Sequence, residues 1–497
     1  MAGGPRFAQP ASEASPAEPL VYGSRAGRLV LLATILASGI TQLDATVVNV
    51  ALPRIGTNLH TGLTGLQWIM NAYTLTLAGL LLLGGSLGDR LGRRRIFVLG
   101  MLWFTAASVG CAVAPTAGLL IAMRAVQGIG AAMLMPGSLA ILQAVFAPGD
   151  RSTAVGAWSG LSGIASALGP VVGGLVVGLA PWGWRIAFFI NVPLAVVVLL
   201  AAKHIPETRD PSASGSLDVV GASLAALGLA GLVYGLTEGS SHGWQRLAIA
   251  ATAVGVALLI AFFIFERHHP SPMLPPRLFR SHQFSAANAM TVVVYGALSG
   301  AFFLLPVELQ RGAGFSPLLA GASLLPATAM LFLLSARMGR LAAIHGPRVQ
   351  MTVGPIIGGA GLALLVLIHP GAAYLPSVMP GVLVFGIGIA ITVAPLTATV
   401  MAAAPPGDVG IASAVNNDVA RTAGLLAVAV FPALSGITAA AYASPVALSR
   451  GFHHAVLIAG ALCALGGVIS AIFIRNDVLA SSDADQSGVV SPAVSSA

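Results

Sequence analysis

The stretch LVLLATILASGITQLDATVVNVALPRIG, residues 29–56, decides the fold, because it is long and apolar enough to cross a lipid bilayer. About 20 apolar residues in a helix span the roughly 30 Å hydrocarbon core. Asp44 lies near the middle of this stretch. A carboxylate at that depth costs roughly 2.5 kcal/mol or more unless it faces a wet cavity or a partner. We therefore predict that Asp44 exchanges a proton; the alternative is a structural hydrogen bond to a neighbouring helix.

The composition is that of a protein with many membrane spans. Hydrophobic residues make up 56 % of the 497 residues and charged residues only 8 %, whereas soluble domains carry about 25 % charged residues. No short apolar segment with a cleavage site follows residues 1–24, so the first span is expected to direct membrane insertion. Cys111 and Cys463 both fall in apolar stretches, which argues against a disulfide framework or a metal site. We expect an all-α polytopic membrane protein without a bound metal.

Fourteen apolar segments are long enough to cross the bilayer. Gly, Pro, Ser and Thr recur inside them, which suits helices that pack closely or line a cavity. The predicted spans are residues 29–53, 65–87, 96–114, 117–146, 153–179, 185–203, 218–238, 245–265, 284–308, 316–338, 349–368, 375–403, 410–439 and 453–474.

The distribution of basic residues predicts the orientation of these spans. Of the 24 Lys and Arg residues, most fall on the side of the N-terminus, and Arg124 and Arg421 lie inside spans. Cytoplasmic loops carry the excess of basic residues in membrane proteins, so we expect both termini in the cytoplasm and the chain in the plasma (inner) membrane. The net charge of +8 therefore does not indicate nucleic-acid binding. The opposite side is predicted to hold only Arg54, Arg185, Arg246, Arg311 and Arg450.

Two polar connectors and an internal repeat divide the chain into six, two and six spans. The connectors are residues 204–217 and 267–283. The loops GSLGDRLGRR (85–94) and GRLAAIHGPR (339–348) share the pattern G-x-L-x4-G-x-R at a separation of 254 residues. Such parallel repeats are typical of carriers with a site between two halves. The predicted parts are a disordered tail (1–28), a six-helix bundle (29–203), two linker helices (218–266), a second six-helix bundle (284–475) and a second disordered tail (478–497).

Five motifs point to one family: LDATVVNVALP (43–53), GGSLGDRLGRRR (84–95), RAVQGIGAAMLMPGS (124–138), SALGPVVGGLV (166–176) and WRIAFFINVP (184–193). Together they resemble the signatures of the major facilitator superfamily, and specifically of its fourteen-span drug:proton antiporter branch of the EmrB/QacA type. The resemblance implies two six-helix bundles plus two extra central helices, with a proton gradient as the energy source and no cofactor. In the second-half loop, Ala343 and Ile344 replace the acid and the arginine of the pattern.

The resemblance identifies Asp44 with the membrane-embedded acid of the branch and Arg124 with its buried base. Because arginine does not lose its proton in proteins, we expect Arg124 to tune the proton site, or alternatively to anchor backbone carbonyls. Asp418 and Arg421 are three residues apart on one predicted helix. They are expected either to neutralise each other or to provide a second titrating acid. The predicted proton-coupling residues are therefore Asp44, Arg124, Asp418 and Arg421.

Two glycine-containing segments are expected to serve the conformational change. Glycines allow a tight turn between spans 2 and 3, and the charged residues there can pair with helix ends; the alternative is that the arginines only set orientation. In span 5, proline bends the helix and glycines let another helix pack against the bend. The predicted latch residues are Gly85, Asp89, Arg90, Gly92, Arg93 and Arg94, and the antiporter helix motif is Gly169, Pro170, Gly173 and Gly174.

The sequence thus predicts a proton-coupled antiporter that exports small, largely hydrophobic compounds, such as drugs or antibiotics, by alternating access. Its partners are the substrate, protons and the lipid bilayer, and we expect a monomer. The pocket should be mostly apolar with a few polar anchors. Candidate substrate contacts are Asn49, Gln67, Trp68, Asn71 and Tyr73 in spans 1 and 2, and Asn288, Tyr295, Asn416 and Asn417 opposite.

Several other classes of function remain as alternatives. A proton-coupled carrier for a specific metabolite or lipid shares every feature above, as does a receptor with a carrier fold. A membrane transferase lacks the expected long polar loop with clustered carboxylates or a His/Ser constellation, so an enzyme is disfavoured. A respiratory proton channel would need buried lysines, yet the single lysine, Lys203, lies at a span end. A nucleotide-driven pump is excluded because there is no P-loop.

Overall fold

The computed structural model describes residues 19–210, 217–270, 272–405 and 408–479, and these residues are almost entirely helical. Fourteen helical segments in this part of the chain are long and apolar enough to span a membrane, which confirms the predicted number. The helices are α1 (Arg25–Asn58), α2 (Leu63–Leu91), α3 (Arg93–Val113), α4 (Ala117–Val145), α5 (Arg151–Leu179), α6 (Trp184–Phe189), α7 (Asn191–Ala202), α8 (Val219–His242), α9 (Arg246–His268), η1 (Pro276–Arg280), α10 (His282–Val307), η2 (Glu308–Gly312), α11 (Pro317–Ala322), α12 (Leu325–His345), α13 (Arg348–Leu364), η3 (Leu365–Leu367), α14 (Tyr374–Ser377), α15 (Met379–Ala402), α16 (Val409–Leu434), α17 (Ala439–Ala443) and α18 (Pro445–Phe473).

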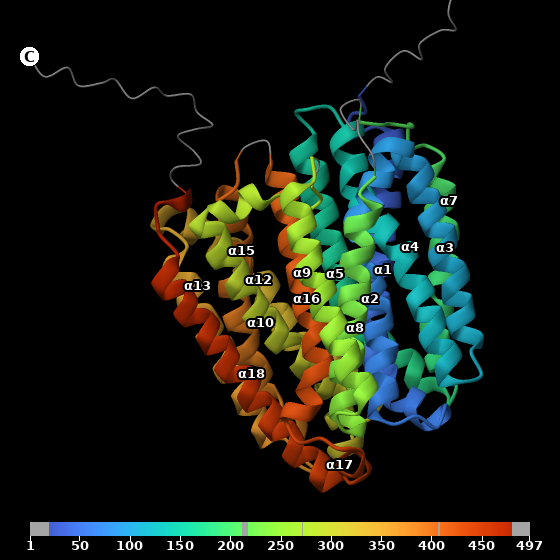
Figure 1. The fold of residues 1–497 in the computed structure, drawn as a ribbon, viewed down its shortest axis with the longest axis vertical. Helices are drawn as coiled ribbons and strands as arrows, with labels where there is room; N and C mark the ends of the chain where they lie inside the picture. The colour runs from blue at the N-terminus through green and yellow to red at the C-terminus, as the bar shows by residue number, and fades with distance from the viewer. Residues whose placement is uncertain (1–18, 211–216, 271, 406–407, 480–497) are drawn as a thin grey trace, which may run out of the picture.

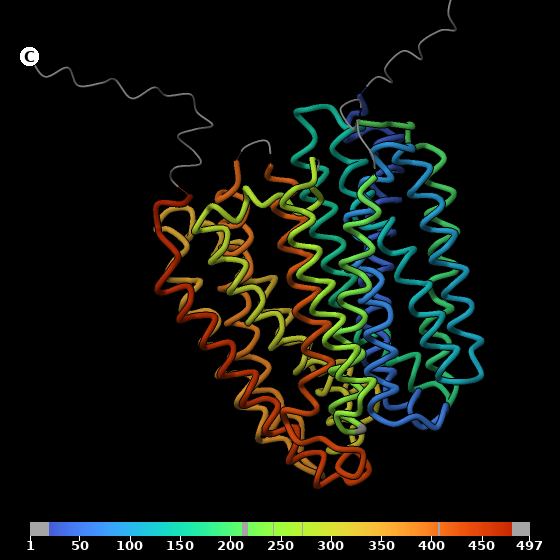
Figure 2. The backbone as a smooth tube through the Cα atoms, in the orientation of Figure 1, coloured from blue at the N-terminus to red at the C-terminus, as the bar shows by residue number. Residues whose placement is uncertain are grey.

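The helices form two groups with a pair of helices between them. Helices α1–α7 pack with one another, and α10–α18 form the second group. Helices α8 and α9, which we call the linker hairpin, pack on each other, and α8 packs against α2 and α16 (Figure 1). Figure 2 shows that the described chain begins and ends at the same end of the helices, which we call the terminal end. The opposite end, which carries α17, is called the far end.

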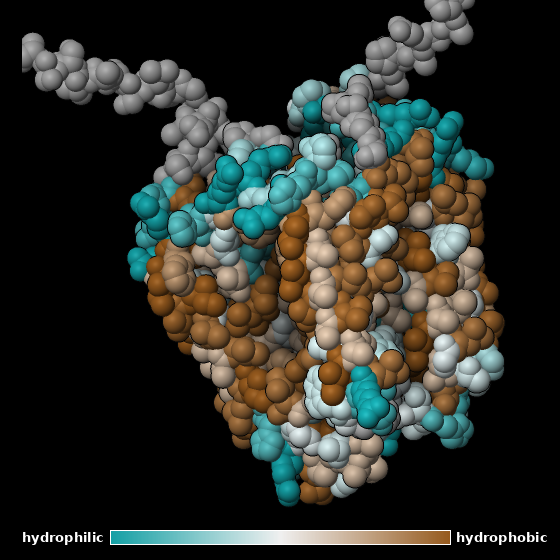
Figure 3. Space-filling view, in the orientation of Figure 1, coloured by the Kyte–Doolittle hydropathy of each residue, from teal (hydrophilic) through white to brown (hydrophobic). Residues whose placement is uncertain are grey.

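The surface around the middle of the helices is apolar. Long apolar side chains such as Leu227, Ile260 and Leu333 are exposed there, and Figure 3 shows a hydrophobic band with hydrophilic residues gathered at the terminal end. In lipid an exposed apolar side chain is favourable and the helices satisfy their own backbone groups. The chain is therefore a multi-pass membrane protein.

In the described structure, the largest hydrophobic cluster joins the two groups toward the far end. This cluster combines residues of the far half of α1, such as Leu52 and Ile55, with residues of the second group, such as Phe303 and Phe431. A separate cluster fills the terminal half of α1–α7 and contains no residue of the second group. Burying side chains from both groups in one core holds the far ends together, whereas the terminal ends of the two groups have separate packing.

Two of the spanning segments contain a proline near a break in the α-helix. Span 6 breaks into α6 and α7 at Ile190, three residues before Pro193, because the proline ring crowds the preceding turn and provides no N–H. Span 9 continues from α10, which contains Pro306, into the π-helix η2. Breaks of this kind expose backbone groups and redirect side chains, and π-helical turns often occur at functional positions.

The described part of the predicted N-terminal tail is ordered, which corrects that boundary. The backbone of Leu20 exchanges hydrogen bonds with Val145 and Ala147, and the N–H of Tyr22 donates to Asp150 Oδ2 at 2.9 Å. Helix α1 then begins at Arg25 rather than at residue 29. Apolar Leu20 and Tyr22 pack against the terminal-end cluster, which local composition did not reveal. Residues 1–18 and 480–497 lie outside the described residues.

Candidate functional site

A charge pair lies at the centre of the first group of helices. Arg124 Nη1 on α4 ion-pairs with Asp44 Oδ2 on α1, and both side chains are completely buried. The backbone carbonyl of Ile69 accepts a hydrogen bond from Arg124 Nε at 3.2 Å. The guanidinium also lies over the ring of Tyr73, 4.2 Å from its centroid. The Arg124 side chain therefore joins α4 to both α1 and α2.

Two amide side chains complete the surroundings of Asp44. Gln127 Nε2 and Asn191 Nδ2 each donate to Asp44 Oδ1 at 2.9 Å. Gln127 Oε1 accepts from Arg124 Nη1 at 2.6 Å, so one amide contacts both charges. Ser108 Oγ accepts from Gln127 at 2.8 Å and from Asn191 at 3.2 Å. These donors compensate the carboxylate in a site that water does not reach.

The local sequence explains how each helix presents its part of this network. Arg124 and Gln127 are three residues apart and therefore lie on the same face of α4. Asn191 is the first residue of α7, directly after the break at Ile190. The close packing of α2 on α4 requires Gly128, because a side chain there would collide with Tyr73 O and Thr76 Oγ1. A cation, an acid and two amides from three helices, α1, α4 and α7, thus meet at one point.

The contacts of Asp44 connect the packing of three helices, α1, α4 and α7. The ionised acid is held by three side-chain donors, while its protonation removes the charge that attracts Arg124. Nη2 of Arg124 and Oδ1 of Asn191 have no hydrogen-bond partner in the described structure. Such buried, unpaired polar atoms favour rearrangement or hydration. A change at Asp44 would therefore be felt by α1, α4 and α7 together.

Gln127, Asn191 and Ser108 are site residues that the sequence analysis missed. Gln127 and Asn191 do fall within two of the motifs quoted above, RAVQGIGAAMLMPGS and WRIAFFINVP. A polar residue in the middle of an apolar span is a signal that could have found them. Their partner, however, lies 83 and 147 positions away in the chain.

A second polar cluster lies in the other group of helices. Asn416 Nδ2 on α16 donates to Asn288 Oδ1 at 3.1 Å and to Thr291 Oγ1 at 2.9 Å, both on α10. Asn417 is exposed and donates to the carbonyl of Ser413. The half-buried Tyr295 lies further along α10. Asn288 and Asn416, two of the candidate substrate contacts, therefore hydrogen-bond to each other in this structure.

The remaining candidate contacts have different surroundings. Gln67 Nε2 on α2 donates to the carbonyls of Val428 and Ala429 on α16, at 2.7 and 3.1 Å, and so links the two groups near the far end. Trp68 points toward the linker hairpin, where its Nε1 donates to Glu238 Oε1 at 2.9 Å. In contrast, Asn49 Oδ1 and Asn71 Nδ2 are buried and have no hydrogen-bond partner in the described structure.

Asp418 and Arg421 do not pair. No hydrogen bond or ion pair joins them in the described structure, and Asp418 Oδ1 is buried without a partner. Arg421 Nη2 instead lies 3.2 Å from Met135 Sδ on α4. The predicted neutralising pair is therefore not formed by a direct contact here, because Arg421 extends to α4 whereas Asp418 lines a cavity beside α8 and α9.

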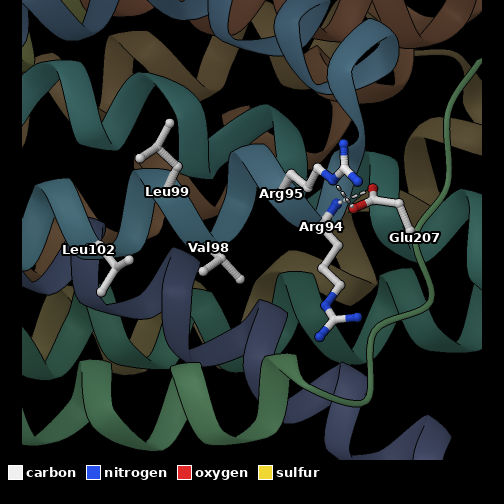
Figure 4. Close-up of a pocket in the computed structure, with 6 residues that line it drawn as sticks. All are labelled: Arg94, Arg95, Val98, Leu99, Leu102 and Glu207. Atoms are coloured by element: carbon white, nitrogen blue, oxygen red, sulfur yellow. Dashed lines mark hydrogen bonds and ion pairs between the residues drawn. The ribbon is translucent and has the colours of Figure 1, made fainter.

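The predicted latch loop lies at the terminal end, against the connector that follows α7. Asp89 ion-pairs with Arg93 at 2.8 Å. The backbone N–H of Arg94 donates to Glu207 Oε1 at 3.1 Å, and Arg95 Nε lies 3.7 Å from Glu207 Oε2 (Figure 4). Gly92 has φ of +117°, a conformation that favours glycine, and packs directly on the Glu207 carboxylate.

The loop between α12 and α13 has the same turn and the same type of backbone hydrogen bond, but its acceptor is a neutral amide and not a carboxylate. Gly346 also has a positive φ, +82°, and the N–H of Arg348 donates to Asn476 Oδ1 at 3.2 Å. Gly346 and Arg348 lie 254 residues after Gly92 and Arg94. Asn476, after the last span of the second group, therefore takes the place of Glu207, after the last span of the first. The sequence repeat is thus a structural repeat as well.

The glycine and proline motif of α5 lies where that helix meets both groups. A side chain on Gly169 would collide with Thr46, and one on Gly173 would press on Val47, both on α1. A side chain on Gly174 would collide with the carbonyl of Pro317, and one on Gly321 with the carbonyl of Pro170. The small residues therefore let α5 approach α1 and α11 closely. Gly85, in the last turns of α2, packs in ordinary contact with Pro136 on α4.

The comparisons with known proteins give the class to which these two helix groups and the linker hairpin belong: a membrane transporter rather than an enzyme. The model of the Major Facilitator Superfamily matches residues 34–429, and the chain belongs to that superfamily. This confirms the resemblance drawn from the motifs.

Individual relatives agree with this assignment. The chain is 34 % identical to a puromycin resistance protein of Streptomyces alboniger over 87 % of each chain. It is 36 % identical to a methylenomycin A resistance protein of Bacillus subtilis (strain 168), over 91 % of this chain and 95 % of the relative. A crystal structure of a POT family transporter in complex with 5-aminolevulinic acid has the same fold, with a TM-score of 0.65 and 14 % identity, over 90 % of this chain and 95 % of that chain.

Proposed function

We propose that this protein exports small, largely hydrophobic compounds in exchange for protons, with Asp44 as the coupling acid. The observation that carries the proposal is the buried contact of Asp44 with Arg124, Gln127 and Asn191. Intramembrane acids mark proton and substrate pathways. The names of two relatives, which refer to resistance to puromycin and methylenomycin A, support efflux of antibiotics.

The proton and the substrate are coupled through the same helices. When Asp44 is ionised, the network draws α1, α4 and α7 together. When Asp44 takes up a proton, the attraction to Arg124 is lost, so the helices are free to change their packing. A substrate that binds between the two groups favours the state in which Asp44 is ionised and its hydrogen bonds are intact. A proton that binds to Asp44 favours the state in which the substrate is released. This gives the two-state element that alternating access requires.

The proposed orientation places the terminal end in the cytoplasm of the cell, in the plasma membrane. The excess of basic residues on that side supports this orientation. The contacts between the two groups, such as Gln67 with Val428 and Gln310 with Val50, lie toward the far end. In this orientation the arrangement corresponds to a state closed to the outside, ready to receive a substrate from the cytoplasm or the inner leaflet.

The test is proton movement in proteoliposomes loaded with a pH indicator. Puromycin and methylenomycin A are added in turn to wild type, to Asp44→Asn and to Asp408→Asn, which alters an acid outside the spans. We expect compound-dependent proton movement in wild type and in Asp408→Asn, and its loss in Asp44→Asn. Equal proton movement in wild type and Asp44→Asn contradicts the role of Asp44. Uptake of compound with no proton movement contradicts antiport.

A further inference from the structure

A pocket of about 540 Å³ lies beside the first turns of α3, at the terminal end of the first helix group. We call it the α3 pocket. Its wall has a charged part at the start of α3 and an apolar part further along the same helix (Figure 4). Because a helix rises about 1.5 Å per residue, the two parts extend over roughly 12 Å of α3. The described residues that line the pocket are Arg94, Arg95, Val98, Leu99, Leu102 and Glu207.

One arginine in the charged part is free to bind an anion. The side chain of Arg94 points away from Glu207 (Figure 4), and in the described structure its guanidinium has no hydrogen-bond or ion-pair partner; only its backbone N–H donates to Glu207 Oε1. Arg95 Nε lies 3.7 Å from Glu207 Oε2. Two arginines against one carboxylate leave the wall with a net positive charge. A guanidinium matches the oxygens of a phosphate group in shape as well as in charge.

The apolar part faces the surroundings of the protein. Leu99 and Leu102 are 47 % and 51 % exposed. Val98 and Leu102 are four residues apart, so their side chains are neighbours on the surface of α3. Figure 3 shows that the hydrophobic band begins next to the hydrophilic terminal end. A ligand that covers the whole α3 pocket therefore needs an anionic group joined to an apolar chain.

The equivalent position in the second helix group has no free arginine. Arg348, which lies 254 residues after Arg94, donates from Nε and Nη2 to the carbonyl of Ala471 at 3.0 and 2.5 Å. Val349 occupies the position of Arg95. The two loops share the same glycine turn, so the turn itself does not require an unpaired arginine. The free guanidinium and the second arginine are particular to the first group.

We propose that the α3 pocket binds an anionic phospholipid, with the phosphate on Arg94 and an acyl chain along Leu99 and Leu102. Basic pockets beside transmembrane helices bind the headgroups of anionic lipids. A phosphodiester such as that of phosphatidylglycerol carries one negative charge and complements the net positive charge of the wall. A soluble phosphate ion offers the same group but leaves the apolar part uncovered. The site does not depend on transport, so binding alone tests it.

The experiment is quenching of a fluorescent reporter by brominated lipids. Ala106→Cys, labelled with bimane, places the reporter at an exposed position one turn beyond Leu102 and outside the lining. Cys111 and Cys463 are buried, so the label is confined to the new cysteine. The full-length protein is reconstituted in equal amounts of phosphatidylglycerol and phosphatidylcholine with identical chains. Either one or the other lipid is brominated, and the ratio of the two quenching values gives the local enrichment of the anionic lipid.

The internal repeat supplies a matched control. Ala360 lies 254 residues after Ala106 and is also exposed, so Ala360→Cys reports on the lipid beside Arg348. Arg94→Gln and Arg95→Gln alter the pocket in the Ala106→Cys background. Arg340→Gln removes the same charge from an exposed residue near the end of α12. Gel filtration checks that each variant is folded.

We expect phosphatidylglycerol to be enriched about fivefold at the Ala106 reporter and much less at the Ala360 reporter. Arg94→Gln should remove the enrichment, Arg95→Gln should reduce it, and Arg340→Gln should leave it unchanged. Equal quenching by the two lipids at Ala106 overturns the proposal. Enrichment of the same size at Ala360 also overturns it, because general surface charge then explains the result. Enrichment that persists in a folded Arg94→Gln variant does so as well. If Arg94→Gln does not fold, the comparison of the two reporters decides.

A final comparison separates a lipid from a soluble anion. Sodium phosphate and sodium chloride are added at the same ionic strength, so both salts screen the arginines equally. The enrichment should fall by the same amount in both salts. A larger fall in sodium phosphate shows that the soluble anion displaces the lipid from Arg94, and this result overturns the assignment of the α3 pocket to a phospholipid.

Discussion

The Nη1 atom of Arg124 ion-pairs with the Oδ2 atom of Asp44 in a place where neither side chain has any exposed surface. Taking both charges out of water is costly, and their attraction offsets that cost only while both are present. The pair is stable when complete and unfavourable when one charge is removed.

The first prediction is that removing the acid of this pair costs more stability than removing the arginine. Asp44→Leu leaves a guanidinium that cannot lose its proton, and removal of one partner of a buried pair costs about 3–5 kcal/mol. Arg124→Leu should cost less, because the remaining carboxyl can take up a proton and still bonds to Gln127 and Asn191. The apparent melting temperature in detergent should fall most for Asp44→Leu and recover in part in the double variant. A larger fall in melting temperature for Arg124→Leu would contradict this account, because the unpaired guanidinium would then not be the main cost.

The second prediction separates the two amides. Gln127 contacts both charges, whereas Asn191 contacts only the acid. A hydrogen bond to a charged group contributes about 1.5–3 kcal/mol. Asn191→Leu should lose about that much stability, and Gln127→Leu more, with a corresponding fall in proton movement. Ser162→Ala is the matched control, because Ser162 Oγ is buried without a partner. Wild-type proton movement in both Leu variants contradicts the network.

The third prediction concerns the contact of α5 with α11. A leucine at Gly174 would collide with the carbonyl of Pro317, so Gly174→Leu should separate the far ends of the two groups. Cys111 and Cys463 are both buried, so a reporter cysteine can be added directly. In a Val50→Cys background, labelling by a membrane-impermeant maleimide should be slow, because Val50 is buried, and at least several-fold faster with Gly174→Leu. Gly178→Leu, where a side chain meets open space, is the control and should label like the parent.

The fourth prediction concerns the pH dependence of the ion pair between η1 and the residue that precedes α16. Arg277 donates to both oxygens of Asp408 at 2.8 Å, and these hydrogen bonds hold the pKa of Asp408 below its ordinary value. The folded state therefore gains stability above the unfolded pKa of about 3.9, and this gain is lost as pH falls through the lower folded pKa. The Arg277 side chain is 55 % exposed, so the gain is at most about 1 kcal/mol.

The measurement is the apparent melting temperature of wild type and Asp408→Asn across pH. Between pH 5 and 8 the variant should be slightly less stable by a constant amount, and below the unfolded pKa the difference should shrink. High salt should reduce the difference in melting temperature as well, because the arginine side chain is largely in solvent and salt screens exposed charges. A difference that grows as pH falls from 8 to 5 contradicts this account of Asp408.

Some features of the molecule follow from local sequence, and these were predicted correctly. The number of spans follows from hydropathy and the thickness of the bilayer, which act on each segment independently of its neighbours. The repeat between loops 85–94 and 339–348 can be read from the sequence, and the structure adds that Gly92 and Gly346 both have a positive φ. The superfamily follows from motifs that are each contiguous in the chain. Only the partners of these loops, Glu207 and Asn476, required the structure.

Other features depend on which helices pack together. Sequence analysis predicted a functional role for Asp44 and Arg124, which stays a prediction. It did not predict Gln127 or Asn191 as their partners, because those contacts need α1, α4 and α7 to converge. Their spacing of three residues favoured a pair between Asp418 and Arg421, but in the structure the two side chains have different surroundings. Arg421 reaches α4, and Asp418 lines the cavity under the linker hairpin. The residues alone thus determined the spans, the repeat and the buried acid, since each is local. Tertiary packing alone decided the partner of each polar side chain, since a partner is set by distance in space and not in sequence.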